Sequence, residues 1–277
     1  MAYQFASVHR VATSQATEYP SNDPLVTRLL SINLLMPDQV RMFAALQGTP
    51  RRVAAHTQLV HATSSKGSTY VIREGWAFAY TLLANGERQI VGFVLPGDVI
   101  RVGCPGRGNT EQGFETITET VFTEITPDAV RRTAREWPEV FVIFLRLQSE
   151  LLSALVGQLV DIGRRDARAR VAQLLLKLER RLLSIGHAEP DGYACPISQY
   201  LIADALGLTA IHVNRVLKGL REDGAVTLRN NRVTIHDRAR LMAIAGEGEI
   251  DEDEGKVVVM NGSRHDSVLS GSHRSRL

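Results

Sequence analysis

Three side chains with hydrogen-bonding chemistry stand close together late in the chain: Asn214, Arg215 and Lys218. An arginine can donate two hydrogen bonds to guanine, an asparagine can pair with adenine, and a lysine can anchor a phosphate. On a helix, Ile211 would share one face with Arg215 and Lys218, because the spacings are four and three residues. A helix that only packed in a core would not need such a face, so the pattern favours contact with the DNA major groove.

Two short amphipathic helices joined at Gly207 would hold these side chains in place. Ser198 can cap a first helix that ends at Leu206, because its hydroxyl can accept a hydrogen bond from a backbone N–H. Gly207 permits a tight turn, and Thr209 is placed to cap a second helix over 210–222. Apolar residues recur in both helices at spacings of three and four, which predicts an inward face. These residues are Ile202, Ala205, Leu206, Val213, Val216, Leu217 and Leu220.

A hairpin follows the second helix as a wing. Asp223-Gly224 is a helix stop, and strands are predicted at 226–228 and 232–235 around the turn Asn230-Asn231. Arg229 and Arg232 flank the tip. A helical hairpin with a solvated charged face is the plainer alternative. Such a hairpin would not need an N-cap, a glycine turn, a polar outer face and a wing to follow one another in this order. This is the order found in a winged helix-turn-helix, which is therefore favoured.

The predicted DNA contacts fall into two groups. Base reading is expected from Ile211, Asn214 and Arg215. Phosphate contacts are expected from Ser198, Gln199, Thr209, His212, Lys218 and Arg232. Double-stranded DNA is therefore the leading partner.

Positive charge is concentrated on the same part of the chain. Residues 163–246 hold 14 Lys or Arg and 8 Asp or Glu, a net charge of +6. Residues 1–162 hold 14 Lys or Arg and 15 Asp or Glu, a net charge of −1. Residues 247–277 hold 4 Lys or Arg and 7 Asp or Glu, a net charge of −3, so the total for the chain is +2. The positive excess therefore lies in the segment that is predicted to bind DNA, where it would be attracted to the phosphate backbone.

The pattern over 52–126 has the period of two that is typical of strands. Trp76, Phe78, Tyr80 and Leu82 alternate with smaller residues, which predicts a half-buried strand. Asn85-Gly86 is a strong hairpin signal. Several short antiparallel strands of this kind predict a small barrel or sandwich.

A helical period begins after Trp137-Pro138. Apolar residues there follow spacings of four and three, with Gln148 as the one polar member, which predicts a coiled-coil seam of about three heptads. The expected dimer interface is Phe141, Leu145, Leu152, Leu155, Leu159 and Ile162, widened by Leu147 and Leu151. The alternative is a core helix packed on its own barrel. A two-fold homodimer would place two recognition helices about one DNA turn apart and read a pseudo-palindromic operator.

Two stretches resemble the Crp/Fnr superfamily of bacterial transcription regulators. Residues 202–217 (IADALGLTAIHVNRVL) look like its winged helix-turn-helix, and residues 70–78 (YVIREGWAF) with 93–98 (FVLPGD) look like its N-terminal β-roll. The resemblance covers roughly 25–246. It implies an α+β fold: an antiparallel, jelly-roll-like β-roll, a long dimerisation helix and a C-terminal winged helix-turn-helix. It also implies transcription regulation, with activation through RNA polymerase favoured over repression.

Within this resemblance, Arg215 matches the family's guanine-reading arginine. Ile211 stands where the family commonly has a glutamate that accepts from cytosine. An isoleucine cannot accept a hydrogen bond, so the base preference there should move toward a thymine methyl or relax.

The expected organisation has five parts. They are a mobile N-terminal arm at 1–24, a β-roll sensor domain at 25–136, a dimerisation helix at 137–162, a DNA-binding domain at 163–246 and a disordered tail at 247–277. A helix is expected from Leu25 to about Leu46, with a break near Met36-Pro37. Residues 163–166 form the expected hinge, through which the resemblance implies that effector signals pass.

The effector region departs from the cyclic-nucleotide branch of the family. That branch carries a Gly-Glu pair and a downstream Arg-Ser or Arg-Thr, and residues 101–117 have neither in register. Arg101 and Arg107 could still meet a phosphate, and Cys104 beside them could be an oxidisable thiol or a small buried residue. A cyclic nucleotide is therefore not the expected ligand.

No metal or cofactor is expected. Cys104 and Cys195 are too few for the four thiolates that usually hold an iron–sulfur cluster. A haem would have to use His56, His61 or Cys104, and a lone histidine is more often a surface or hydrogen-bonded residue. Oxidation of Cys195 could disturb DNA docking if its thiol were reactive.

The competing function class is an enzyme or ligand carrier built on the β-roll. The sequence contains no phosphate-cradling G-x-x-x-x-G-K loop, no H-E-x-x-H and no nucleophile elbow, so a regulator is favoured. We also expect no membrane-spanning segment and no signal peptide, which predicts a cytoplasmic protein.

Overall fold

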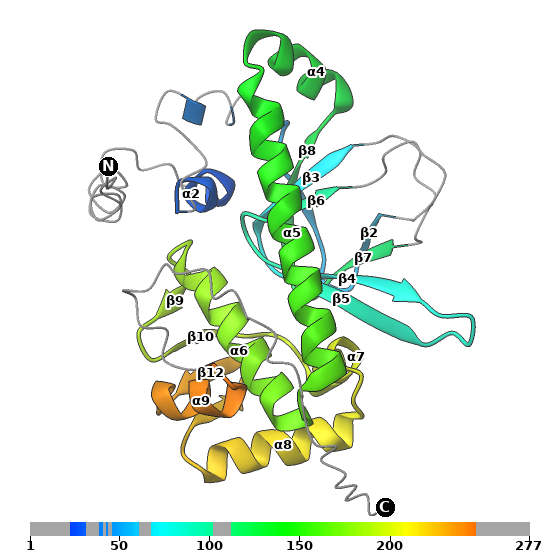
Figure 1. The fold of residues 1–277 in the computed structure, drawn as a ribbon. Helices are drawn as coiled ribbons and strands as arrows, with labels where there is room; N and C mark the ends of the chain where they lie inside the picture. Colours follow the sequence, from blue (N-terminus) through cyan, green and yellow to red (C-terminus); the bar gives the residue numbers. More distant parts are fainter. Residues whose placement is uncertain are drawn as a thin grey trace, which may run out of the picture.

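The N-terminal half is a β-roll of two antiparallel sheets (Figure 1). The computed structural model describes residues 23–31, 39, 40, 43, 46–60, 68–101 and 112–247. One sheet holds, in spatial order, β1 (Arg51–Val53), β8 (Thr120–Ile125), β3 (Thr69–Glu74) and β6 (Val99–Arg101). The other holds β2 (Gln58–Val60), β7 (Gln112–Thr116), β4 (Ala77–Leu82) and β5 (Arg88–Val94). The predicted jelly-roll-like fold is therefore confirmed.

The hairpin between β4 and β5 forms at the predicted Asn85-Gly86 turn. Gly86 adopts a φ of 84°, and Leu83 N–H donates to the Glu87 carbonyl at 2.8 Å. The register pairs Leu82 with Arg88. The start of β5 is thereby fixed relative to the rest of the roll.

Strand β4 is buried on both faces, so the prediction of a half-buried strand was wrong. Ala77 and Ala79 face the interior of the roll, in a cluster with Phe114. Phe78 and Tyr80 belong to a different cluster, which extends into the C-terminal half of the chain. Leu82 lies at the exposed end of the strand. Large and small side chains do alternate along the strand, but the side chains on both of its faces are buried.

Helix α2 (Pro24–Ser31) rests on the turn between β5 and β6. A Cβ at Gly97, whose φ is 83°, would lie 2.5 Å from the Pro24 carbonyl oxygen, so only glycine permits this approach. Asp23 is buried and accepts from the backbone N–H of Leu25 at 2.9 Å. The folded domain therefore begins slightly before the predicted end of the arm, and the rest of the arm lies outside the described residues.

The long helix α5 (Glu139–Arg164) follows the short helix α4 (Pro127–Glu136) and runs beside the roll to the C-terminal domain (Figure 1). Val140, Ile143 and Leu147 are buried in a cluster with α2. Leu147 is only 7% exposed, so its assignment to the outward seam was wrong. Residues on the core face and residues on the outward seam both recur with helical spacing, so spacing alone does not separate them. Leu147 lies on the core face.

Helix α5 bears on the expectation of no membrane-spanning segment. By length and composition it is long and apolar enough to cross a membrane. The expectation rested on an unbroken apolar run, whereas α5 is interrupted by Arg146 and Glu150. One such helix is weak evidence for a membrane span, and its apolar side chains already have a core face and an outward face.

The C-terminal domain begins after a break at Arg165-Asp166, within the predicted hinge. Asp166 caps α6 (Ala167–Leu183) by accepting from Ala169 N–H at 2.8 Å. The remaining elements are β9 (Ala188–Glu189), β10 (Gly192–Ala194), α7 (Gln199–Leu206), α8 (Ala210–Glu222), β11 (Val226–Arg229), β12 (Arg232–Ile235) and α9 (Arg238–Ala245). Strands β9 and β10 extend the wing to a four-stranded sheet in the order β11-β12-β10-β9.

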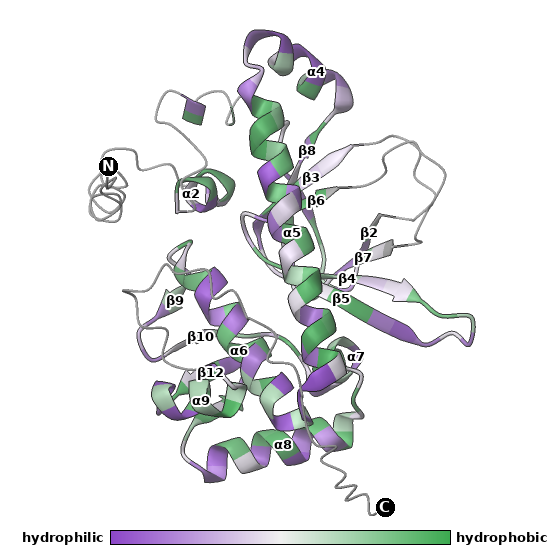
Figure 2. Ribbon diagram, in the orientation of Figure 1, coloured by the Kyte–Doolittle hydropathy of each residue, from purple (hydrophilic) through white to green (hydrophobic). Residues whose placement is uncertain are grey.

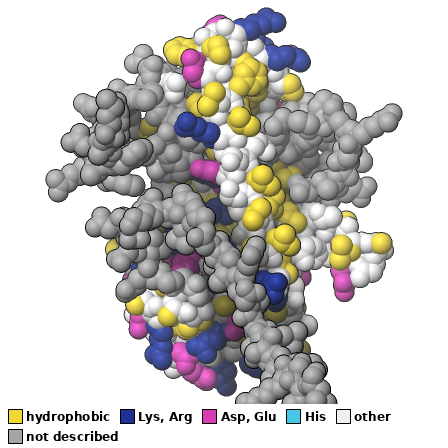
Figure 3. Space-filling model, viewed as in Figure 1, with side chains coloured by type: hydrophobic (Ala, Val, Ile, Leu, Met, Phe, Trp, Pro, Cys, Tyr) yellow, Lys and Arg dark blue, Asp and Glu magenta, His cyan; other side chains and the backbone are white. Residues whose placement is uncertain are grey.

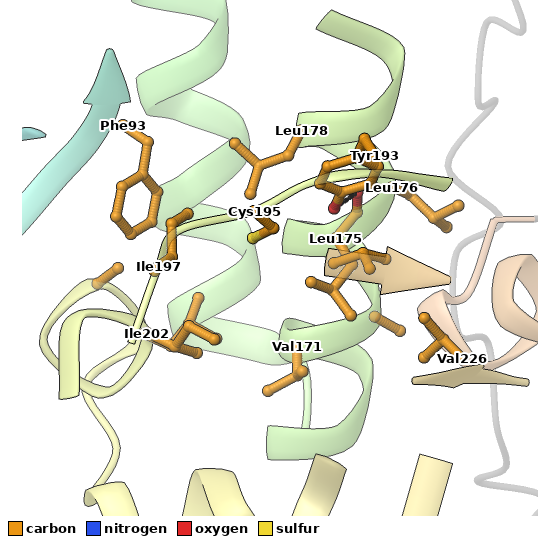
Figure 4. Close-up of a cluster of buried hydrophobic side chains, with 14 of the residues drawn as sticks. Phe93, Val171, Leu175, Leu176, Leu178, Tyr193, Cys195, Ile197, Ile202 and Val226 are labelled. Atoms are coloured by element: carbon orange, nitrogen blue, oxygen red, sulfur yellow. Dashed lines mark hydrogen bonds between the residues drawn. The ribbon is translucent and has the colours of Figure 1, made fainter. Parts of the chain in front are cut away.

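The core of this domain forms around α6 (Figure 4). Val171, Leu175 and Leu178 are almost fully buried, and the Tyr193 hydroxyl donates to the Leu175 carbonyl at 2.7 Å. Phe93 of the β-roll lies in the same cluster, near Ile197. The apolar core is therefore continuous between the two halves of the protein.

Candidate nucleic-acid interface

The helix-turn-helix forms at the predicted residues. The Ser198 hydroxyl accepts from Leu201 N–H at 3.3 Å, and the Thr209 hydroxyl accepts from His212 N–H at 3.2 Å. Gly207 adopts a φ of 63° and ψ of 42°, the left-handed conformation that glycine tolerates best. These local caps fix where α8 begins and hence which of its residues point outward.

The predicted base-reading residues lie together on the outer face of α8. Ile211 is 77% exposed, and Asn214 and Arg215 are exposed one turn further on. Within the described part of the chain, the side chains of Asn214 and Arg215 form no hydrogen bond or ion pair. The opposite face is buried through Val213, Leu217 and Leu220. Helix α8 lies at the end of the molecule opposite α4 (Figure 1), and its outer face is exposed through Ile211, Asn214 and Arg215.

The predicted phosphate contacts surround this face. Ser198 and Gln199 are exposed at the start of α7, and Thr209 and His212 are exposed at the start of α8. Lys218 is exposed and lies 3.7 Å from Glu222 in an i,i+4 pair. Such a surface pair contributes little free energy, so the ammonium can turn to another anion.

Arg232 lies in a different environment from the one predicted. Its guanidinium is 2.5 Å from a Glu189 oxygen and 3.1 Å from an Asp191 oxygen. The hydrogen bond to Glu189 raises the pKa of Arg232 above its usual value. Two carboxylates from the β9–β10 hairpin thus neutralise this end of the wing. Arg229, opposite Arg232 in the register, is exposed and has no ion-pair partner among the described residues.

The outward face of α5 carries an exposed apolar band (Figure 3). Leu145 and Leu159 are each 71% exposed, and α5 is hydrophobic over much of its length (Figure 2). Five of the six predicted seam residues are exposed, and Ile162 is half-buried. The predicted Leu151 is exposed on the band, which is broader than predicted because it also includes Val142, Val156 and Val160.

Comparison with known proteins decides the family. The Crp-like helix-turn-helix domain matches residues 169–244. The nitrogen fixation regulation protein FixK of Bradyrhizobium diazoefficiens is 34% identical over 178 residues, which cover 64% of this chain and 74% of FixK. The chain belongs to the Crp/Fnr family.

Two further comparisons agree. FnrL of Cereibacter sphaeroides is 30% identical over 62% of this chain and 69% of FnrL. The structure of FixK2 from Bradyrhizobium japonicum has a TM-score of 0.64 and 26% identity, over 71% of this chain and 96% of FixK2. This Crp/Fnr protein is a DNA-binding transcription regulator rather than an enzyme, because its relatives are regulators of that type.

The structure describes only some of the residues predicted to form the effector site of this Crp/Fnr regulator. Arg101 ends β6, and its side chain, like Cys104, Arg107 and His61, lies outside the described residues. His56 is exposed, and its ring lies 3.9 Å from Glu115. No group of three or more His, Cys, Asp or Glu among the described residues could hold a metal ion.

Cys195 does not have the environment of a redox switch. The thiol is fully buried in the core around α6, and burial raises its pKa to about 11 (Figure 4). Because the thiolate is the reactive form, oxidation of this residue is disfavoured at neutral pH. The condition under which oxidation of Cys195 would disturb DNA docking, a reactive thiol, is therefore not met.

Sequence reasoning missed the ion pair that holds α9 in the domain of this Crp/Fnr regulator. Glu179 of α6 is fully buried, and both of its oxygens accept from Arg238 at 2.6 Å. Glu247, predicted to begin the tail, belongs to the folded domain, because Arg180 donates to both of its oxygens at 2.8 and 2.9 Å. A lone glutamate on the apolar face of α6 was the available signal for a buried cationic partner.

Proposed function

We propose that the protein acts as a homodimer that reads a pseudo-palindromic operator with one α8 helix per half-site. The open face of α8 carries this proposal, because Asn214 and Arg215 are exposed and unpaired within the described chain. The apolar band of α5 supports the homodimer. A second copy related by a two-fold axis would cover the band and present two copies of α8 on one side.

In this proposal each residue of α8 has a separate task. Arg215 donates to guanine, and Asn214 contacts a neighbouring base or phosphate. Ile211 packs against a thymine methyl, because its side chain can neither donate nor accept a hydrogen bond. Lys218, His212, Gln199 and the capping residues Ser198 and Thr209 line the phosphates on either side.

The experiment that tests this assignment is selection from randomised duplexes with the parent and two variants. Arg215→Ala is expected to cost about 1–3 kcal/mol and to flatten the preference at one position of each half-site. Lys218→Ala is expected to weaken binding to all DNA sequences alike. It should also reduce by about one the slope of the logarithm of the affinity against the logarithm of the salt concentration, called here the salt slope. An unchanged base preference in Arg215→Ala would show that α8 does not read the groove in this way.

The wing offers a second, independent test. The variant Glu189→Gln/Asp191→Asn removes the two carboxylates that neutralise Arg232 and should free its guanidinium for a phosphate. We expect tighter DNA binding and a salt slope steeper by about one, measured by titration at several salt concentrations. As a control, Arg232→Ala in the same background should restore the parent's slope. An unaltered slope in the double variant would leave Arg229 as the arginine of the wing that contacts DNA.

We further propose that the β-roll senses an effector other than a cyclic nucleotide, a haem or an iron–sulfur cluster. The absent Gly-Glu and Arg-Ser or Arg-Thr pattern in 101–117 and the two cysteines of the chain support this. Native mass spectrometry and an absorption spectrum of protein purified from its host would identify any bound group. A bound cyclic nucleotide or a haem Soret band would contradict the proposal.

We also propose that the protein activates transcription, that RNA polymerase is its second partner, and that it acts in the cytoplasm. The relative FnrL is named a transcriptional activator, which supports the sign of regulation. An activator bound beside a promoter acts on the polymerase there. Transcription in vitro with and without the protein tests this, and a decrease in transcript would make the protein a repressor.

A further inference from the structure

The first helix of the helix-turn-helix ends against the β-roll. Gln89 is the second residue of β5, and its side-chain amide donates to the Asp204 carbonyl at 2.8 Å and to the Ala205 carbonyl at 3.3 Å. Arg88, beside it, lies 2.9 Å from the Asp204 carboxylate. Both contacts join residues more than one hundred positions apart in the chain.

The two hydrogen bonds from Gln89 satisfy a specific need of α7. The last four carbonyls of a helix have no partner within the helix and carry partial negative charge. In α7, Leu208 N–H caps the Ala203 carbonyl, and Arg170 Nη1 caps the Leu206 carbonyl at 3.1 Å. The two carbonyls between them, of Asp204 and Ala205, are capped from outside the DNA-binding domain.

Gln158 of the long helix reaches the same point. Its amide lies 3.5 Å from the Ala205 carbonyl and 3.4 Å from the Ile90 carbonyl of β5. The C-terminal end of α7 is therefore held at once by the β-roll and by α5, whose outward face carries the apolar band. Since α7 packs directly on α8, this contact links the orientation of α8 to that of α5.

Arg88 is fixed in place for this task. Its guanidinium lies over the Phe78 ring at 4.9 Å from the centroid, and Nη1 lies 3.6 Å from Glu115. Because the ring and the second carboxylate restrict its movement, little freedom is lost in the bond to Asp204. The contact is thus a preorganised one between two domains.

We propose that Arg88 and Gln89 are positioning residues for operator recognition, which set the spacing between half-sites that the dimer accepts. This inference rests on the proposed function, because it needs two copies of α8 on one duplex. Neither residue contacts DNA. Gln89 acts by capping the carbonyls of α7 and Arg88 by pairing with the Asp204 carboxylate, and both contacts restrict the angle at which α8 enters its groove. The specificity they confer is for spacing, not for bases.

The test uses the full-length chain and duplexes that carry the selected half-sites with the separation changed one base pair at a time. The parent should prefer one separation by about tenfold over its neighbours, and Arg88→Ala/Gln89→Ala should reduce this preference to about twofold. Base preference within each half-site should not change. Asp204→Ala removes the Arg88 contact from the α7 side and should lower the preference in the same direction, which decides the matter if the double variant does not fold.

Arg52→Ala is the matched control. Arg52 forms exposed ion pairs with Glu74 and Glu119 within the β-roll, so its loss should leave the spacing preference unchanged. A parent-like preference in folded Arg88→Ala/Gln89→Ala and in Asp204→Ala would overturn the inference and show that the hinge alone sets the spacing. Tighter binding by these variants at every separation would also overturn it, because the contacts would then oppose DNA binding. A parent that binds no duplex would overturn the proposed function and this inference with it.

Discussion

The variant Leu152→Lys/Leu159→Lys is expected to be a folded monomer with DNA affinity reduced by about 100-fold or more, because two linked half-site contacts become one. Both leucines are highly exposed in the single chain, so the substitution leaves the core of the monomer intact. In a dimer, the two lysines of each chain would bury unpaired charge in the apolar band. Analytical ultracentrifugation and a mobility-shift titration measure the two effects separately.

Ala154→Lys is the control for that experiment. Ala154 is an exposed residue of α5 about half a turn from the line through Leu145, Leu152 and Leu159. The substitution adds one lysine to the same helix, away from the apolar band, and should affect neither association nor DNA binding. A monomeric Leu152→Lys/Leu159→Lys protein that binds DNA like the parent would show that one chain is the binding unit.

Arg238→Ala is expected to destabilise the DNA-binding domain by about 3–5 kcal/mol, because it leaves the buried Glu179 carboxylate without its partner. In the parent, both Glu179 oxygens accept from Arg238, and this hydrogen bonding raises the pKa of Arg238. The pair also holds α9 against α6. The midpoint of urea unfolding, followed by circular dichroism, measures the loss.

Two further variants separate the buried charge from a general effect of removing an arginine. Arg240→Ala, on the same helix, loses one exposed hydrogen bond to the Asp223 carbonyl and should cost less than about 1 kcal/mol. Glu179→Gln in the Arg238→Ala background should recover part of the stability, since a neutral amide is cheaper to bury than a carboxylate. Equal midpoints for Arg238→Ala and Arg240→Ala would contradict this account.

Local chemistry explains why the helix-turn-helix was predicted to the residue. Ser198, Gly207 and Thr209 act within three residues of their own positions, through side-chain caps and a left-handed turn. The same holds for Asn230 and Asn231, whose positive φ values of 49° and 55° form the predicted hairpin turn. Signals of this kind do not depend on the rest of the fold.

Tertiary contacts account for the errors. Leu147 and Leu151 both continue the helical spacing of α5, but Leu147 is buried in a cluster with α2 and the β-roll, which the spacing does not reveal. The partners of Arg232 lie about forty residues earlier, in a hairpin too short to leave a strand pattern. Helix α9 was missed because its burial rests on two residues, Leu241 and Ala245, and gives no clear period.

The apolar cluster shared by Phe93 and the α6 core has a consequence for how the protein comes apart. Two domains joined only by a hinge would melt in separate steps, whereas domains that share buried side chains lose each other's support together. A DNA-binding domain excised at Arg165-Asp166 would uncover the side chains that meet Phe93 and Ile90 and leave two carbonyls of α7 without their caps. The β-roll therefore contributes to the stability of the DNA-binding domain, and the two halves are expected to unfold together.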